Sequence, residues 1–314
     1  MTAMSKERDP KGERAQDPYP SRLPEERFLP RQDKTVWSQW RPDAPLTAQQ
    51  ADQFDRDGFL IVKDVFSAEE IEALMAESAA LRGGERELMD GSVITEPGSD
   101  EVRTVFKLPE QSPLFNRLAR DRRVAGVASF LLGDEVYVHQ SRLNYKPGFT
   151  GKEFYWHSDF ETWHAEDGMP RMRAISASLL LTDNDALNGP LMLMPGSHKE
   201  FIACAGETPD DNHKASLKKQ EVGVPSHEAL TKLASRHGIT AATGKAGTLV
   251  FFDCNTMHGS NGNITPFSRS NAFFVFNAMS NRLEEPFGAK KARPDFLAER
   301  GEVQALEVAA GKLV

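Results

Sequence analysis

The sequence is short of cysteine and has no long apolar run. Only two cysteines, Cys204 and Cys254, occur among 314 residues, too few for a disulfide framework and typical of a reducing compartment. We predict that both are buried as small hydrophobic side chains. No apolar run approaches ~18 residues, which excludes a transmembrane helix. Residues 1–30 are charged and proline-rich, without the apolar segment of a secretory signal, so we expect a cytoplasmic protein.

The chain also lacks an excess of positive charge. Its net charge of −8 argues against nucleic acid as a general partner, because phosphate binding needs a positive surface. A content of 39% hydrophobic and 27% charged residues is typical of a globular protein with a sizeable core. Residues 1–45 carry little apolar periodicity and predict a mobile or surface-draped N-terminal extension. We expect residues 46–314 to form a single domain with a polar insert around residues 207–238.

Helix signals come first along the chain and strand signals follow. Two capping boxes, Thr47 with Gln50 and Ser67 with Glu70, predict helix starts on either side of a strand at residues 59–63. Further helical patterns span residues 113–132 and 226–237. Short strands are expected at residues 135–146, 173–182, 191–194, 247–252 and 269–279. This order predicts a mostly β, α+β fold: a double-stranded β-helix or jelly-roll (cupin-like) core with flanking helices.

The stretch from Phe154 to Pro170 concentrates aromatic rings, histidines and carboxylates more than a core segment or a solvated loop requires. Within it, His157 and Asp159 are two residues apart, so on an extended strand both side chains leave the same face. Such a pair can hold a divalent metal and leave its far side open, as in non-haem Fe(II) oxygenases. Because one His-x-Asp/Glu pair is weak evidence, the pairs beginning at His164 and His198 need to be separated from it by context.

A third ligand and an anion anchor are predicted downstream. His258 follows the strand at residues 247–252, a position suited to a ligand at the mouth of a barrel. The strand beginning at Arg269 places Asn271 and Phe273 on the face of that arginine. Polar groups on an interior face need a partner, and a guanidinium binds a carboxylate through two parallel hydrogen bonds. Arg269 is therefore the predicted anchor of a dicarboxylate co-substrate.

A second predicted strand carries polar side chains on one face. Alternation over residues 136–146 places Gln140, Arg142 and Asn144 together, opposite His139 and Leu143. A solvated edge strand would explain this pattern equally well. Two such strands together with the histidines and the aspartate favour a ligand-binding interior.

The chain resembles the phytanoyl-CoA dioxygenase-type branch of the Fe(II)/2-oxoglutarate-dependent oxygenases, and within it the ectoine hydroxylases. The signature of the latter, Phe-x-Trp-His-Ser-Asp-Phe-Glu-Thr-Trp-His-x-Glu-Asp-Gly-Met/Leu-Pro, is complete from Phe154 to Pro170. Flanking segments match at residues 139–148, 188–192, 195–198 and 258–263. The resemblance covers roughly residues 45–300.

This resemblance implies a role for each site residue. It implies iron ligands at His157, Asp159 and His258, and a 2-oxoglutarate site formed by Arg269, Arg142, Asn144 and Phe106. It implies that ectoine lies against Trp163 and Phe252, with further contacts from Gln140, Thr162, Ser178, Asn271 and Phe273. We expect Trp156 to be a core ring, His164 and Glu166 to brace the loop, and His198 to stabilise a turn.

The implied reaction converts ectoine, 2-oxoglutarate and O2 into 5-hydroxyectoine, succinate and CO2 through a ferryl intermediate, in protection against osmotic and temperature stress. The resemblance also implies a homodimer, with no membrane partner. A hydroxylase of another small compound would keep Arg269 and the metal ligands and differ in the wall formed by Gln140, Thr162, Trp163 and Asn271. A jelly-roll metal protein without oxygen chemistry, such as a zinc isomerase or a sugar-binding module, would not need Arg269.

Overall fold

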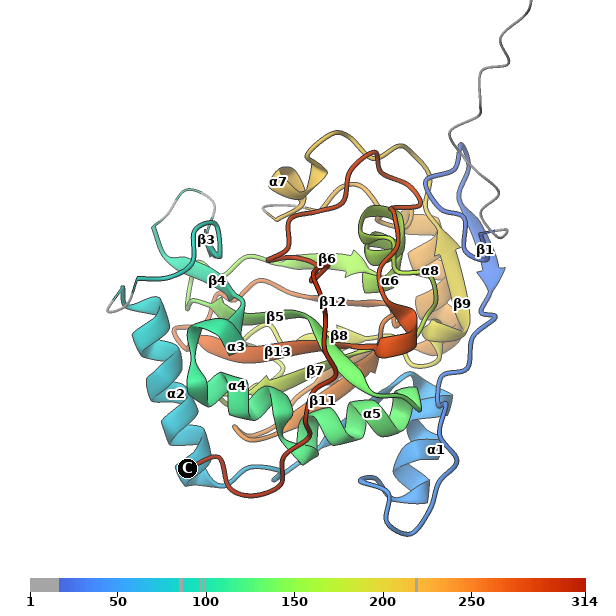
Figure 1. The fold of residues 1–314 in the computed structure, drawn as a ribbon. Helices are drawn as coiled ribbons and strands as arrows, with labels where there is room; N and C mark the ends of the chain where they lie inside the picture. Colours follow the sequence, from blue (N-terminus) through green and yellow to red (C-terminus); the bar gives the residue numbers. More distant parts are fainter. Residues whose placement is uncertain (1–16, 85–86, 97, 99, 218–219) are drawn as a thin grey trace, which may run out of the picture.

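The strands of the computed structural model form three antiparallel sheets (Figure 1). The structure describes residues 17–84, 87–96, 98, 100–217 and 220–314. The largest sheet has the strand order β2 (Phe59–Val62), β11 (Leu249–Asp253), β7 (Ala174–Leu180), β13 (Arg269–Ala278), β5 (Val136–Lys146), β4 (Val102–Phe106) and β3 (Val93–Thr95). A second sheet has the order β10 (Thr240–Ala242), β8 (Leu191–Leu193), β12 (His258–Ser260) and β6 (Phe154–His157). A short pair joins β1 (Arg27–Pro30) to β9 (Glu200–Ala203).

Helices cover one side of the large sheet and the ends of the barrel. They are α1 (Ala48–Asp57), α2 (Ala68–Arg82), α3 (Leu108–Gln111), α4 (Pro113–Arg120), α5 (Val127–Leu132), α6 (Asp159–Thr162), α7 (Asn212–Ser216) and α8 (His227–His237). Single turns of other geometry are η1 (Arg122–Gly126), η2 (Trp163–Asp167), η3 (Ser197–Lys199) and η4 (Met279–Asn281). Both predicted capping boxes form, at Thr47 with Gln50 and at Ser67 with Glu70. None of the described helices is long and apolar enough to cross a membrane.

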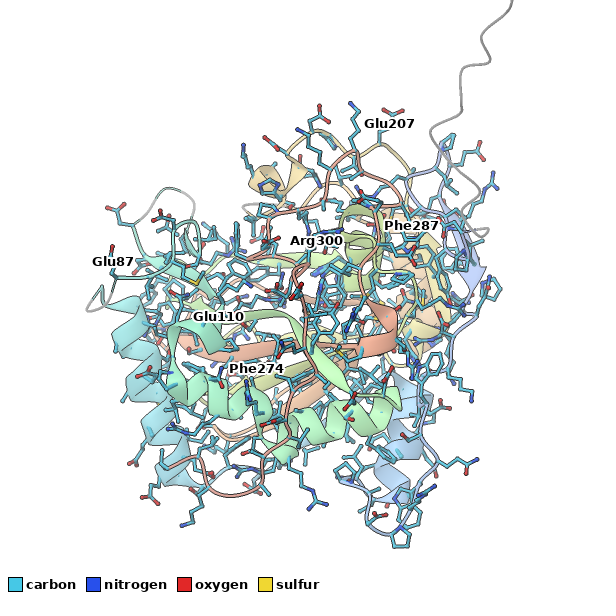
Figure 2. The ribbon with its side chains drawn as sticks, in the orientation of Figure 1. Glu87, Glu110, Glu207, Phe274, Phe287 and Arg300 are labelled. Carbon is cyan, nitrogen blue, oxygen red and sulfur yellow. The ribbon has the colours of Figure 1, made fainter. Side chains whose placement is uncertain are left out.

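Alternation along the strands gives the large sheet two unlike faces. Leu143, Ala272 and Phe274 belong to the main apolar cluster, which also contains residues of α2, α4 and α5. Figure 1 shows these helices on one side of the strands, and Figure 2 labels Phe274 in this region. The opposite face carries Arg269 and Asn271 and is turned toward the interior of the barrel. The predicted α+β fold with a double-stranded β-helix core is confirmed.

The described part of the N-terminal segment packs against the β core. Tyr19 is fully buried and its ring contacts those of Phe160 and Phe201 edge-on, at centroid distances of 5.2 and 5.5 Å. Residues 1–16 of the predicted extension lie outside the described residues. Whether residues 1–45 are mobile stays a prediction, but residues 17–45 contribute a strand and a core ring.

The sequence predicted the long strands and missed several short ones. Strands β3, β4, β10 and β12 have three to five residues each, too few for alternation to separate them from loop. The predicted helix at residues 226–237 is confirmed as α8, and α7 is a second helix in the same insert. The two cysteines are buried and unpaired, as predicted.

Candidate metal and co-substrate site

Three predicted ligands converge where the second sheet meets the short helix α6. His157 ends β6, and His258 opens the neighbouring strand β12 directly opposite it. The Nε2 atoms of His157 and His258 lie 3.6 and 3.8 Å from the carboxylate oxygens of Asp159. One ligand atom from each of the three residues lies within 4.8 Å of the others, which makes them a candidate metal site among the described residues.

The path of the chain between His157 and Asp159 differs from the expected strand. Ser158 is extended, but Asp159 is the first residue of α6, so the pair occupies a strand-to-helix junction. The expectation that both residues lie on one strand is therefore wrong. The chain turns at Ser158 because its hydroxyl donates to Asn255 Oδ1 at 2.9 Å, while Phe160 N donates to the Cys254 carbonyl oxygen. The two ligands converge through this turn.

Hydrogen bonds orient both imidazole rings for metal binding. Nδ1 of His157 lies 2.6 Å from the Tyr155 carbonyl oxygen, and Nδ1 of His258 lies 2.9 Å from that of Thr256. Each Nδ1–H therefore donates outward, which leaves Nε2 as an electron-pair donor facing the site. Burial lowers the pKa of His258 to about 4, so this ring is neutral at pH 7. Two imidazoles that present Nε2 and one carboxylate, with an open side, are the donor set that non-haem Fe(II) binds.

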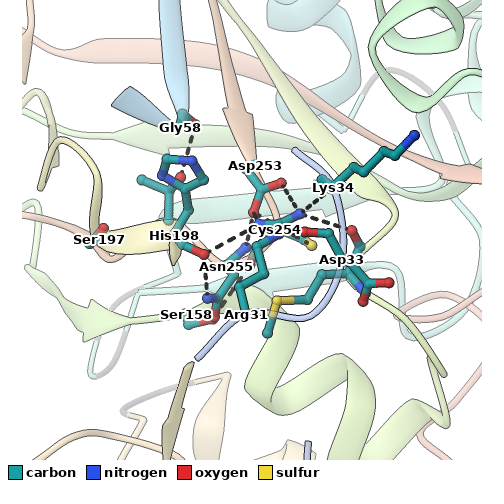
Figure 3. A network of polar contacts seen from close by, with 12 residues as sticks. Arg31, Asp33, Lys34, Gly58, Ser158, Ser197, His198, Asp253, Cys254 and Asn255 are labelled. Carbon is teal, nitrogen blue, oxygen red and sulfur yellow. Dashed lines mark hydrogen bonds and ion pairs between the residues drawn. The ribbon is translucent and has the colours of Figure 1, made fainter. Parts of the chain in front are cut away.

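A polar network supports the segment from His157 to Asp159, here called the metal loop (Figure 3). Arg31 pairs with Asp253 through two hydrogen bonds of 2.7 and 2.9 Å. Asp253 Oδ1 accepts from the backbone N–H of Asn255, whose side chain accepts from Ser158 between the two ligands. The N-terminal segment thus reaches the metal loop through Arg31, a contact that links residues more than 200 positions apart.

Arg22 connects a second part of the N-terminal segment to α6 and η2, which follow the metal loop. Its guanidinium donates to Glu161 at 2.6 and 2.8 Å and to Glu166 at 3.1 Å. These side chains are at most 3% exposed, and Glu166 also accepts from Asn212 of α7 at 2.8 Å. A Cβ at Gly223 would come within 2.2 Å of Glu161, so the insert can approach this cluster only through a glycine.

Histidines 164 and 198 both lie outside the three-residue ligand cluster and contact other parts of the chain. His164 bonds to the Met169 carbonyl oxygen and to Asp17, at 2.7 and 3.0 Å, and stacks on Phe287 at 4.0 Å. Figure 2 labels Phe287 and, further along the same C-terminal segment, Arg300. His198 Nε2 contacts the Asp55 carbonyl oxygen at 3.1 Å. Trp156, predicted as a core ring, is partly buried and packs against an apolar cluster.

A cavity of about 780 Å³ opens beside His157 and Asp159. Its wall includes eight of the predicted site residues: Phe106, Gln140, Arg142, Asn144, His157, Asp159, Thr162 and Trp163. The other six are not on this wall: Ser178, Phe252, His258, Arg269, Asn271 and Phe273. Strand β13 pairs Asn271 with Asn144 and Phe273 with both Arg142 and Ser178, so these residues lie beside the cavity wall in the same sheet. Phe252 contacts the His258 ring at a centroid distance of 4.9 Å.

Arg269 is buried without a countercharge. The residue is 5% exposed, and among the described residues no carboxylate lies within 4.0 Å of its guanidinium. With the Asn271 amide turned to satisfy its neighbours, Oδ1 accepts from Arg269 Nη1 at 3.0 Å. Burial lowers the pKa of Arg269 to about 10, so the group is still charged at pH 7. A buried, unpaired guanidinium is costly unless an anion binds to it.

Sequence reasoning missed two segments that line the cavity. One is the polar insert, which contributes Asn212, Ser216, Leu217, Gln220, Val222 and His227. The other is the C-terminal segment, where Arg293 pairs with Asp167 at 2.6 Å and the Leu297 carbonyl oxygen accepts from Gln140 at 2.7 Å. Neither segment has the residue spacing of a metal or ligand site. The polarity of the insert was the one signal that could have indicated a role.

Comparison with known proteins identifies the family. Residues 54–271 match the family described as phytanoyl-CoA dioxygenase (PhyH). The ectoine dioxygenase of Sphingopyxis alaskensis is 60% identical over 300 residues, which are 95% of this chain and 98% of that protein. That of Stutzerimonas stutzeri is 52% identical over 293 residues, which are 93% and 97% of the two chains.

Solved structures agree with this assignment. The crystal structure of EctD from S. alaskensis with 2-oxoglutarate and 5-hydroxyectoine has a TM-score of 0.88 and 56% identity, over 95% of this chain and 100% of that one. The structure of the same protein with bound Fe has a TM-score of 0.87 and 55% identity over the same shares of the chains. The chain therefore belongs to the phytanoyl-CoA dioxygenase family, in its ectoine dioxygenase branch.

Proposed function

We propose that this protein hydroxylates ectoine to 5-hydroxyectoine with 2-oxoglutarate as co-substrate, and that the residues predicted above perform the reaction. The observation that carries the proposal is the pairing of two features in one interior. A His-Asp-His cluster with an open side lies near a buried guanidinium without a countercharge. A jelly-roll protein without oxygen chemistry has a use for the first feature but not for the second.

His157, Asp159 and His258 would hold the iron, which with 2-oxoglutarate and O2 supplies the oxidising power for hydroxylation. The protein contributes the fixed positions of these ligands. The pKa of Asp159 is lowered: burial opposes its ionisation, but the electrostatic effect of His258 and its contact with His157 outweigh it. Asp159 is therefore a carboxylate, and not a carboxylic acid, at neutral pH.

Arg269 would bind the distal carboxylate of 2-oxoglutarate through its planar guanidinium. Arg142, Asn144 and Phe106 would line the rest of that site, since β5 and β4 place them side by side on the inner face. The Arg142 guanidinium lies over the Phe273 ring at 4.8 Å, which fixes its plane. These groups orient the co-substrate and leave its other end free to reach the metal.

Ectoine would lie in the cavity against Trp163, with Phe252 beside the cavity wall as its second aromatic contact. The ectoine ring carries a delocalised cation that aromatic faces attract. The remaining proposed contacts come from Gln140, Thr162, Ser178, Asn271 and Phe273. Trp163 is held by an edge-on contact with His139 at 5.2 Å. The insert and the C-terminal segment line the cavity, where they would limit the access of water to the reaction.

We also propose a homodimer, on the resemblance to the family, and a cytoplasmic location, on the composition of the sequence. The choice of ectoine over another small compound is supported by the identity to ectoine dioxygenases over nearly the whole chain.

The test is an aerobic incubation with Fe(II), ascorbate and 2-oxoglutarate, with and without ectoine. We expect succinate that depends on ectoine, together with a mass gain of one oxygen atom in the substrate. His157→Ala should abolish both signals, and Lys245→Met, a change at an exposed surface lysine, should leave them intact. Succinate without a change in ectoine would contradict the substrate. No succinate with iron demonstrably bound would contradict the reaction.

A further inference from the structure

One turn contacts both segments that carry the candidate metal ligands. It runs from Asp253 to Thr256 and joins β11 to β12. The Thr256 carbonyl oxygen accepts a hydrogen bond from Nδ1 of His258 at 2.9 Å. The Thr256 side chain in turn donates to the Gly58 carbonyl oxygen at 2.9 Å, which ties the turn to the end of α1. The orientation of the His258 ring therefore depends on the backbone of this turn.

The same turn holds the chain on both sides of Asp159. Directly before this ligand, the Ser158 hydroxyl donates to Asn255 Oδ1 at 2.9 Å. Directly after it, the backbone N–H of Phe160 donates to the Cys254 carbonyl oxygen at 2.8 Å. Because these two hydrogen bonds flank the ligand, a displacement of the turn would move Asp159 relative to the histidine on β12.

The Asp253 side chain fixes the shape of the turn. Its Oδ1 accepts from the backbone N–H of Asn255 at 2.8 Å, the contact by which an aspartate stabilises a turn two residues on. The Asn255 amide also donates to the carbonyl oxygens of His198 and Glu200, each at 3.0 Å. These contacts hold the Asn255 oxygen toward the metal loop. The Asp253 carboxylate therefore determines where the turn presents its hydrogen-bonding groups.

Arg31 supplies the countercharge of Asp253 from the N-terminal segment (Figure 3). The guanidinium donates to both carboxylate oxygens, at 2.7 and 2.9 Å, and the two side chains are only 5% and 2% exposed. It also donates to the carbonyl oxygens of Met172 and Lys34, both at 3.0 Å. Two parallel hydrogen bonds fix the plane of a carboxylate as well as neutralising its charge. Arg31 thereby holds the Asp253 oxygen on the turn.

We propose that Arg31 is a positioning residue for the metal centre. Through Asp253 it fixes the turn that sets the spacing of the three metal ligands, and it thereby strengthens metal binding. This inference rests on the proposed function, because it concerns the iron of that reaction. An ion pair that served the fold alone would change metal binding only as far as it changes stability. A positioning residue has an effect on metal binding that stability does not account for.

The experiment measures Co(II) binding to the full chain by calorimetry and by the visible absorption of the bound ion, which reports its coordination geometry. We expect Arg31→Met to weaken Co(II) binding by about 10- to 100-fold and to alter the spectrum, because a group that orients metal ligands is lost. Arg123→Met is the matched control, since this arginine also pairs with two buried carboxylates, those of Glu70 and Asp121. Its Co(II) affinity should stay within about threefold. Unchanged affinity and spectrum in Arg31→Met would overturn the proposal.

A double variant separates positioning from stability. Arg31→Met leaves the Asp253 carboxylate buried without its cation, which should lower the urea concentration at the midpoint of unfolding. Addition of Asp253→Leu removes that unpaired charge, so the midpoint should recover in part. Co(II) binding should not recover, because the turn now lacks the carboxylate that fixes it. If Co(II) affinity recovered together with stability, the ion pair would serve the fold alone and the proposal would be wrong.

Ser158→Ala tests the same route if Arg31→Met does not fold. It removes one hydroxyl and with it the hydrogen bond between the metal loop and Asn255. Co(II) binding should weaken by about 3- to 10-fold, whereas Ser112→Ala, at a buried serine that caps α4, should leave it unchanged. Equal Co(II) affinity in both serine variants would overturn the proposal. If the unsubstituted chain bound neither Co(II) nor Fe(II), the proposed function would fail, and this inference with it.

Discussion

The two faces of β13 are equally buried but differ in what surrounds them. On the outer face, Ala272 and Phe274 are 0% and 1% exposed and pack among apolar side chains under the helices. On the inner face, Asn271 and Arg269 are 0% and 5% exposed and carry polar groups that protein atoms satisfy only in part. Burial therefore does not separate structural from functional residues here. Among the described residues, Arg269 differs from its outer-face neighbours in carrying a buried charge without a counterion, which an anionic ligand would satisfy.

The comparison also separates what the two faces do for the protein. Apolar burial on the outer face stabilises the fold, whereas the buried charge on the inner face opposes folding until an anion binds. Substitutions on the outer face should lower the stability of the fold, and those on the inner face should weaken ligand binding. Substitutions in the N-terminal segment should do both.

The largest effect on stability is expected on the outer face. Phe274→Ala removes a ring that is 1% exposed, which should lower the free energy of unfolding by about 3–5 kcal/mol. Phe274→Leu, which leaves a smaller gap, should cost less. Urea unfolding measures both values. In the folded fraction, the KM for 2-oxoglutarate should be unchanged, and a large rise in that KM would show that the two faces are not independent.

Arg22 should affect both stability and substrate binding. Arg22→Met leaves Glu161 and Glu166 buried without their cation, which should destabilise the fold by about 3 kcal/mol. Glu166 also lines the cavity, so the KM for ectoine should rise more than that for 2-oxoglutarate. Arg22→Lys keeps the charge without the planar fork and should recover part of the loss. If both KM values stayed unchanged, the N-terminal segment would be a purely structural support.

Arg269 gives the opposite pattern to Phe274. Arg269→Met should weaken 2-oxoglutarate binding by about 2 kcal/mol or more, since a charge-assisted pair is lost. In the absence of 2-oxoglutarate the variant should be as stable as the unsubstituted protein, or more so, because an unpaired buried charge has been removed. Thermal unfolding with and without 2-oxoglutarate measures both effects. Destabilisation of the ligand-free protein would mean that Arg269 has a structural partner.

Local signals explain which parts of this structure could be predicted. The capping boxes at Thr47 and Ser67 and the alternation of Arg269 and Asn271 involve residues a few positions apart, and all are confirmed. The roles of individual site residues came from the family signature and stay predictions. The turn at Ser158, by contrast, depends on Asn255, nearly a hundred residues away.

Long-range packing explains what was missed. The ion pair between Arg31 and Asp253 joins residues far apart in the sequence, so no local pattern predicts it. The cavity walls from the insert and from residues 293–297 are likewise set by tertiary structure.

The smallest effect should come from Glu70, outside the sheet altogether. Hydrogen bonds from Arg123 are the main cause that lowers the pKa of Glu70 from 4.5 to about 2. Because the folded-state pKa is the lower one, Glu70 contributes stability above pH 4.5 that is lost as the pH falls toward 2. Its partner Arg123 is partly exposed, so solvent screening limits the contribution to about 1 kcal/mol or less.

Glu70→Gln removes this charge and keeps a hydrogen-bonding side chain at the start of α2. The difference in unfolding free energy between the two proteins should be constant from pH 7 to about pH 5 and shrink to zero between pH 4.5 and 2. Urea titrations at steps of pH measure this window. Since Glu70 lies far from the inner face, binding of 2-oxoglutarate at pH 7 should be the same in both proteins. A difference that persisted below pH 2 would mean that the substitution perturbs the helix start itself, and the stability would then not come from the charge.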